Sequence, residues 1–153
     1  MVQVGELAPE VTFDGPDGEP TNLTAWRGRP LVLYFYPKDD TSGCTREAQD
    51  FTALAGEFES AGVALLGVSK DSTRKHKAFT EKYALKVPLG TDADGRLIEA
   101  FGAWVEKRLY GRKYMGIDRS TFLIDREGRI VREWRKVKVP GHAEQVLEAA
   151  RSL

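Results

Sequence analysis

Two continuous apolar runs along the chain predict buried central strands. The first fills positions 31–36 and the second fills positions 63–69. A strand that is covered on both faces has such a run, whereas a strand with one wet face alternates apolar and polar residues. Between the runs, apolar residues recur at helical spacing and mark the buried face of one helix, which Gly62 ends: Ala48, Phe51, Ala55 and Phe58.

The later part of the chain continues this alternation. Asp71 or Ser72 is placed to cap a further helix, which stops before Pro88. Residues 120–134 have the pattern of two strands joined by a turn, and a final helix is expected after 140–141. The second half therefore adds a helix, a hairpin and a closing helix.

The order of these elements defines the fold class. Residues 11–18 add a short hairpin at the start, around a turn of Gly, Pro and Asp. Strands that alternate with helices indicate an α/β protein with parallel central strands. The terminal hairpin and helix narrow this to a thioredoxin-like fold with an N-terminal β-hairpin extension and a central mixed sheet flanked by helices. Residues 1–153 contain no repeat or linker, so we expect one domain.

Composition is that of an ordinary soluble globular protein. Of the 153 residues, 41% are hydrophobic and 30% are charged. No apolar run approaches the roughly 20 residues that a membrane span needs. The first residues have neither the basic patch nor the apolar stretch of a secretory signal, so we expect a cytoplasmic location and no membrane partner.

Net charge is zero, but the two halves of the chain differ. Residues 1–76 hold 7 Lys and Arg against 12 Asp and Glu, and residues 77–153 hold 16 against 11. A basic half is compatible with nucleic-acid binding, which would give salt-dependent retention on DNA or RNA. The charges alternate along 129–135, however, as on the solvated face of a strand. We therefore expect no nucleic-acid partner.

The candidate chemistry rests on Cys44, the only cysteine of the chain. One cysteine excludes an intrachain disulfide and a thiolate-rich metal site, and neither histidine has neighbours at metal-ligand spacing. A lone cysteine is most often an inert buried residue. Cys44 instead falls in the first turn of the predicted helix, among polar neighbours. The free N–H groups and the dipole of a helix start favour a thiolate, so this position favours a reactive thiol.

The segment around this cysteine resembles a known active-site signature. Pro37, Thr41 and the cysteine have the residue types and spacing of the peroxiredoxin signature, and 34–48 is closely similar to the bacterioferritin-comigratory, or Q-type, branch. Residues 67–72 and 114–125 are similar too, so the resemblance extends over nearly the whole chain. It implies a thiol-dependent peroxidase that reduces hydrogen peroxide and organic hydroperoxides without a cofactor or a metal.

The resemblance implies a role for each residue of the signature. Cys44 is expected to attack the terminal peroxide oxygen as a thiolate and to become a sulfenic acid. Thr41 is expected to hold the peroxide through its hydroxyl, and Pro37 to shield the pocket. Without the resemblance, Thr41 has the position of a simple helix cap and Pro37 that of a strand end.

Three further residues complete the implied site. Arg119 is expected to stabilise both the thiolate and the charge that develops along the O–O bond. Glu47 is expected to orient this arginine, and Gly43 lets the backbone approach a ligand closely. The simplest alternative for Arg119 is an exposed strand residue. The aromatic and basic residues of 104–114 either line the pocket and admit bulky hydroperoxides, or form an insertion on the surface.

The sequence departs from the Q-type pattern at the residue that regenerates the thiol. Many members carry a second, resolving cysteine, at the position of Gln49 or on the next helix at the position of Thr80. This chain therefore resembles a one-cysteine peroxidase. Its sulfenic acid would need a thiol from outside the chain. That thiol would come from glutathione, a glutaredoxin or thioredoxin, or from a second chain that forms an intermolecular disulfide. We expect a monomer or a weak homodimer.

Two other functions would also depend on a single reactive cysteine. A peroxide-sensing or holdase-like redox protein would be oxidised once, without efficient turnover. A general thiol–disulfide oxidoreductase would need Cys-x-x-Cys, but Thr41 and Glu47 occupy the positions at which a second cysteine would lie. The resemblance favours the peroxidase.

Overall fold

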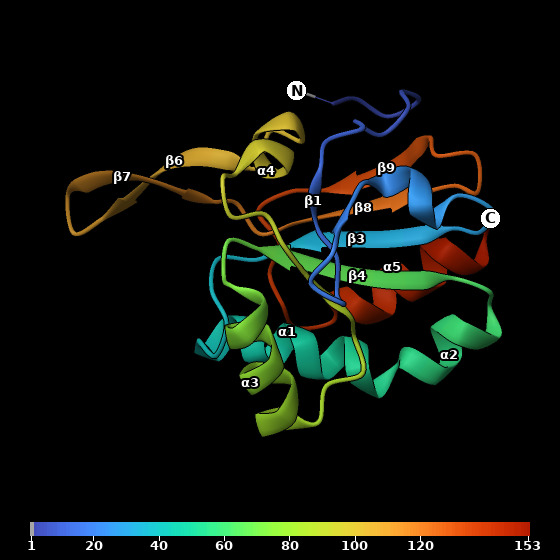
Figure 1. Cartoon of the computed structure of the whole chain (residues 1–153), viewed down its shortest axis with the longest axis horizontal. Coiled ribbons are helices and arrows are strands. Elements are labelled where there is room, and N and C mark those ends of the chain that lie inside the picture. The colour runs from blue at the N-terminus through green and yellow to red at the C-terminus, as the bar shows by residue number, and fades with distance from the viewer. Residues whose placement is uncertain (1) are drawn as a thin grey trace.

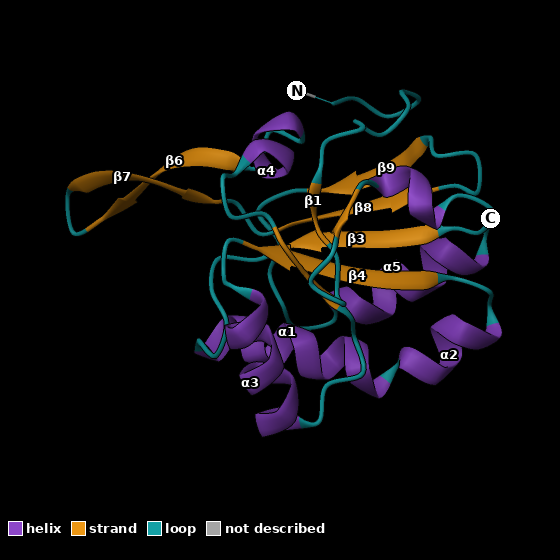
Figure 2. Ribbon diagram, in the orientation of Figure 1, coloured by secondary structure: helices purple, strands orange, loops and turns teal. Residues whose placement is uncertain are grey.

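The computed structural model describes residues 2–153, which fold around a seven-stranded mixed sheet (Figures 1 and 2). The strands lie in the order β2-β1-β5-β4-β3-β8-β9. Their bounds are Phe13–Asp14 (β1), Pro20–Thr21 (β2), Leu31–Phe35 (β3), Ala64–Ser69 (β4), Leu89–Thr91 (β5), Ser120–Ile124 (β8) and Ile130–Trp134 (β9). Strands β3, β4 and β5 are parallel, and the remaining neighbours are antiparallel. The predicted N-terminal hairpin, central mixed sheet and later hairpin are confirmed.

Helices cover both faces of this sheet (Figure 1). Their bounds are Ser42–Ala53 (α1), Ala55–Ser60 (α2), Thr73–Tyr83 (α3), Arg96–Ala100 (α4) and His142–Arg151 (α5), with a 3-10 turn at Leu23–Trp26. The final helix predicted after 140–141 is α5. Within residues 2–153, no helix is both long and apolar enough to cross a membrane.

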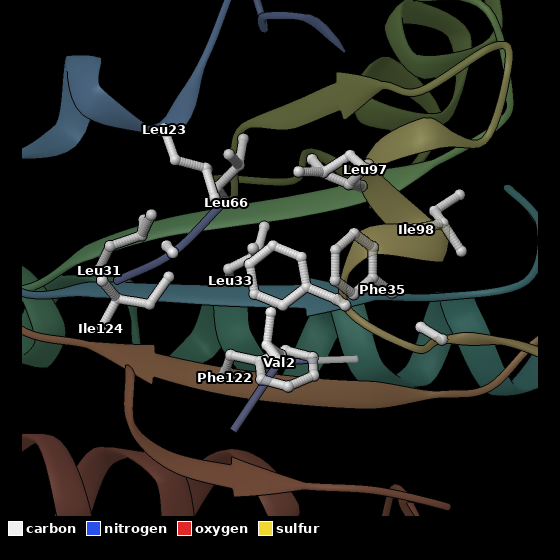
Figure 3. Close-up of a cluster of buried hydrophobic side chains, with 14 of the residues drawn as sticks. Val2, Leu23, Leu31, Leu33, Phe35, Leu66, Leu97, Ile98, Phe122 and Ile124 are labelled. Carbon is white, nitrogen blue, oxygen red and sulfur yellow. The ribbon is translucent and has the colours of Figure 1, made fainter. Parts of the chain in front are cut away.

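The central strand β3 shows why the sheet is buried on both faces. Its side chains alternate, so that Leu31, Leu33 and Phe35 belong to one apolar cluster and Val32 and Tyr34 belong to the other. The first cluster lies against the N-terminal segment and α4 (Figure 3). The second lies against α1, α2, α3 and α5. The continuous apolar run therefore marks a strand covered on both sides, as predicted.

The structure corrects the single helix predicted over 48–58. The chain leaves helical geometry at Leu54 (φ −100°, ψ 3°), whose N–H donates to the Phe51 carbonyl in a tightened turn. Helices α1 and α2 are therefore separate. The change of direction keeps Phe51 and Phe58 buried in the same cluster, which is why helical spacing of apolar residues persists across the break.

The helix predicted between Asp71 or Ser72 and Pro88 is α3, and the structure shows where it begins and ends. Ser72 is the cap of this helix, because its Oγ accepts the N–H of Lys75. The helix ends at Tyr83 because Ala84 adopts the left-handed conformation (φ 51°). Pro88 then leads into β5, a short strand that the sequence pattern did not predict.

Strands β6 (Trp104–Leu109) and β7 (Arg112–Ile117) form a hairpin that projects from the body of the molecule (Figure 1). The sequence pattern did not predict this hairpin, because most of its side chains are exposed and no apolar face marks it. Its turn is Tyr110-Gly111, both at positive φ, and Tyr110 is 96% exposed. The alternative of a surface insertion therefore describes most of 104–114, although the hairpin leads directly into Arg119.

Candidate active site

Cys44 lies in the first turn of α1, as predicted, at the point where the chain arrives from β3. The side chain is only 2% exposed, and its Sγ accepts a hydrogen bond from Arg119 Nη2 at 3.4 Å. The N–H groups of a first helical turn have no partner within the helix, and the helix dipole adds positive potential there. The Arg119 guanidinium and the start of α1 therefore both favour a negative charge on this sulfur.

Arg119 is held in place by Glu47. The Arg119 Nη1 donates to Glu47 Oε1 at 2.7 Å, while Nη2 of the same guanidinium is on the Cys44 sulfur. The two side chains are 17% and 1% exposed. Arg119 lies between β7 and β8 rather than in a strand, so the alternative of an exposed strand residue is wrong. The predicted pairing of Glu47 with Arg119 is present in the structure.

Burial and the ion pair set the charges of this cluster. Burial raises the pKa of Glu47 to about 7, although Arg119 opposes the shift. Glu47 Oε2 is buried and has no hydrogen-bond partner among the described residues. Burial also acts against the charge of Arg119, but Glu47 and Cys44 outweigh it and raise the pKa of the guanidinium. Arg119 is therefore a permanent cation beside the sulfur.

The other signature residues lie on the loop before α1 and in its first turn. Thr41 is exposed and occupies the N-cap position of α1, but its hydroxyl donates to the Lys38 carbonyl at 2.9 Å and makes no capping hydrogen bond. Pro37 is half-buried just after β3. At Gly43, an added Cβ would lie 3.1 Å from Arg119 Nη2. The close approach at Gly43 is thus made by the arginine side chain.

Two residues near the sulfur were not singled out by the sequence. Burial raises the pKa of Tyr34, and Glu47 and Cys44 act in the same direction. Tyr34 stacks on Phe51 of α1, with ring centroids 4.8 Å apart, and so supports the helix below the site. Burial lowers the pKa of Lys107 on the projecting hairpin. In the sequence, Tyr34 is an ordinary residue of a buried strand, and Lys107 is one of several basic residues in the segment 104–114.

His142, at the start of α5, is buried and packs against Phe51, which belongs to the same apolar cluster as Cys44. Its Nε2 is 2.8 Å from Thr121 Oγ1, and its ring packs edge-on against Phe51 and Trp134. Burial lowers its pKa from 6.5 to about 4, and the Arg119 charge acts in the same direction. The imidazole is therefore neutral near pH 7, and its Nε2 is a neutral partner for the threonine hydroxyl.

This histidine gives the protein a measurable acid sensitivity. Because the unfolded chain takes up the proton near pH 6.5 and the folded chain only near pH 4, stability is lost as pH falls across that interval. We expect a loss of about 2–3 kcal/mol from this residue. Urea unfolding at several pH values from about 7.5 to 4 gives the free energy of unfolding of the wild type and of His142→Gln. As pH falls, the wild type should lose this amount of stability relative to His142→Gln. A constant difference between the two proteins would contradict the assignment, because Glu47 titrates in both and cancels from the difference.

The fold and the site together define a class of protein. Parallel β3, β4 and β5 with antiparallel β8 and β9 are a thioredoxin-like arrangement, and a buried thiol beside a fixed cation suits the reduction of an oxidant. A family model described as the AhpC/TSA family matches residues 4–133, and the chain belongs to this family. Peroxiredoxin Bcp of Bacillus subtilis is 45% identical over 152 residues, covering 99% of this chain and 97% of the relative. Peroxiredoxin Bcp of Xanthomonas campestris is 49% identical over 148 residues, covering 94% and 92%.

Solved structures agree with this assignment. The bacterioferritin comigratory protein of X. campestris, studied for its alkyl peroxide reduction, superposes with a TM-score of 0.90 at 45% identity over 98% of both chains. A PrxQ variant from Xylella fastidiosa superposes with a TM-score of 0.92 at 38% identity over 99% and 97%. The predicted thioredoxin-like peroxiredoxin of the Q-type branch is therefore confirmed. The chain is a thiol-dependent peroxidase, whose partners are a peroxide and a thiol reductant.

Proposed function

We propose that Cys44 is the thiolate that this peroxidase uses to reduce hydrogen peroxide and organic hydroperoxides. The observation that carries the proposal is the Arg119 guanidinium, which donates to Cys44 Sγ while Glu47 holds its other nitrogen. The sulfur attacks the terminal peroxide oxygen, an S–O bond forms and the O–O bond breaks. The departing oxygen takes a proton and leaves as water or an alcohol, and Cys44 becomes a sulfenic acid.

The neighbouring signature residues and Arg119 have separate roles in this reaction. The Thr41 hydroxyl gives its proton to the Lys38 carbonyl, so its oxygen is left to accept the O–H of the peroxide. Arg119 is placed to donate to the peroxide oxygens as charge develops on them. Pro37 has no N–H and shields the pocket beside the strand end. Gly43 leaves room for the arginine.

Regeneration of the thiol needs an external reductant, because the chain has no second cysteine. The X. campestris relative has been solved with two different cysteines replaced by serine, 36 positions apart. The residue 36 positions after Cys44 is Thr80, half-buried on α3. We propose that glutathione, a glutaredoxin or thioredoxin attacks the sulfenic acid instead, and that residues 1–153 act as one domain in a monomer or weak homodimer. The cytoplasmic location remains a prediction from the sequence.

The recycling step is tested by offering these reductants one at a time. The protein is oxidised with one equivalent of peroxide, and each reductant is then added while intact mass and peroxide consumption are followed. We expect a mixed disulfide between Cys44 and glutathione, its removal by glutaredoxin, and peroxide turnover well beyond one equivalent. A single oxidation without turnover under every reductant would instead support the sensing or holdase-like protein.

A further inference from the structure

The loop that carries Pro37 and Thr41 into α1 is fixed to α3 through two consecutive aspartates. Asp40 is exposed and at positive φ (59°), and its carboxylate accepts from Lys82 Nζ and from the Tyr83 hydroxyl, both at 2.7 Å. Asp39 is buried and contacts His76 of α3, about two helical turns before Tyr83. In Figure 1, α3 lies next to the start of α1, where this loop ends. The loop is therefore held from outside and from inside the fold.

The inner contact is a buried pair between Asp39 and His76. His76 is 4% exposed, and its Nδ1 is 2.6 Å from Asp39 Oδ2. Its Nε2 is 2.9 Å from the Gly90 carbonyl in β5. The Tyr36 hydroxyl donates to the other oxygen of Asp39, and the Asp39 N–H donates to Asp71 Oδ2 at 2.8 Å. The carboxylate and the backbone of Asp39 are both held.

The chemistry of these partners makes the pair a rigid connection. A carbonyl oxygen only accepts, so His76 Nε2 carries a proton and donates it to Gly90. Nδ1 and the Asp39 carboxylate then share one further proton, which satisfies both groups without water. Hydrogen bonds of this charge-assisted kind are among the strongest in proteins, and burial strengthens them. The imidazole therefore links the backbone of β5 to the active-site loop.

We propose that His76 is a positioning residue for peroxide reduction, acting through Asp39 on the loop that presents Thr41 and Pro37 to Cys44. This inference rests on the proposed function of Cys44. Asp39 follows Lys38, whose carbonyl accepts the Thr41 hydroxyl. A displacement of Asp39 therefore moves the group that directs the Thr41 oxygen. The polar partners of the His76 ring are Asp39, Tyr36 and Gly90, so we expect its effect on Cys44 to be indirect.

The inference is tested by comparing two reactions of Cys44 in variants of His76. Oxidation by hydrogen peroxide needs the loop, whereas alkylation by iodoacetamide needs only the thiolate. We expect His76→Leu to slow oxidation by about 10–100-fold, while alkylation changes by less than ~3-fold. His76→Gln keeps one donor for Asp39 and should recover part of the oxidation rate. The matched control is Arg151→Met, which removes an exposed ion pair with Glu57 away from this loop and should stay within ~2-fold.

A second measurement separates positioning from a general effect on stability. If His76 acts through Thr41, the double variant Thr41→Val, His76→Leu should oxidise no more than ~3-fold slower than Thr41→Val alone. If the two substitutions instead slow oxidation by factors that multiply in the double variant, the inference is wrong. It is also wrong if His76→Leu slows oxidation and alkylation of Cys44 by the same factor. Should His76→Leu not fold, His76→Gln and Asp39→Asn carry the same comparison. Wild-type Cys44 that resists peroxide would refute the proposed function, whereas a normal rate in the His76 variants would refute only this inference.

Discussion

Cys44→Ser is expected to abolish peroxide reduction, with a loss of at least ~10³-fold. Serine is close to cysteine in size, but an alcohol is not ionised near neutral pH and does not attack the O–O bond. The chain has no other cysteine that could take over the reaction. Peroxide consumption in the presence of dithiothreitol measures the loss directly.

A control for this variant is available in the same chain. Met115 on the β7 strand is 50% exposed and is an oxidisable sulfur that the proposed chemistry does not use. Met115→Leu should keep the wild-type rate. A Cys44→Ser protein that retains more than about a tenth of the wild-type rate would show that another group reduces the peroxide.

The second large effect is expected from Arg119→Met. Removing the guanidinium takes away the fixed cation 3.4 Å from the sulfur, so peroxide oxidation of Cys44 should slow by about 10²–10³-fold. The same change leaves Glu47, which is 1% exposed, without its counter-ion. Breaking a buried pair in this way costs about 3–5 kcal/mol of stability. Stopped-flow oxidation and urea unfolding measure the two consequences separately.

The stability loss in Arg119→Met should depend on pH in a defined direction. The pKa of Glu47 is already raised to about 7 by burial, and it rises further once Arg119 is gone. The folded variant therefore holds a proton on Glu47 that the unfolded chain releases, so stability falls as pH rises. The variant should be least stable, relative to the wild type, near about pH 8.5, and closer to it near about pH 5.5.

Two variants distinguish the electrostatic explanation from a general loss of packing. Arg119→Met combined with Glu47→Gln should regain most of the stability, because no carboxylate is left uncompensated, yet should stay slow with peroxide. Arg135 is another half-buried arginine, paired with Glu133. Arg135→Met should keep the peroxide rate. A fast Arg119→Met protein, or a slow Arg135→Met protein, would contradict the assigned role of Arg119.

The sequence predicts those parts of the fold whose signal is local. The run at 31–36 belongs to a strand that is buried on both faces, and such a run needs no knowledge of its neighbours. The position of Cys44 in a first helical turn is also local, because turn-forming residues separate it from the strand. The β6–β7 hairpin was missed because most of its side chains are exposed, so apolar residues do not recur there at a regular spacing. The break at Leu54 was missed because both helices bury residues at continuous helical spacing.

The site is less predictable than the fold, because its contacts join distant parts of the chain. Composition and spacing identified Cys44, but the partnership with Arg119 came from the resemblance to peroxiredoxins. The link between Asp39 and His76 had no sequence signal at all: an aspartate in a turn and a histidine on a helix are ordinary residues. Only the folded structure shows that both are buried and 2.6 Å apart. Tertiary contacts of this kind decide which polar residues support the chemistry.

Cys44 is proposed to be the residue that peroxide oxidises, and chemical trapping can show this oxidation at the level of the residue. The protein is treated with a sub-stoichiometric amount of hydrogen peroxide in the presence of dimedone, which traps sulfenic acids, and its peptides are analysed by mass spectrometry. We expect a dimedone adduct on Cys44 in proportion to the peroxide added, with Met115 unmodified. A free Cys44 thiol alongside an oxidised Met115 would contradict it.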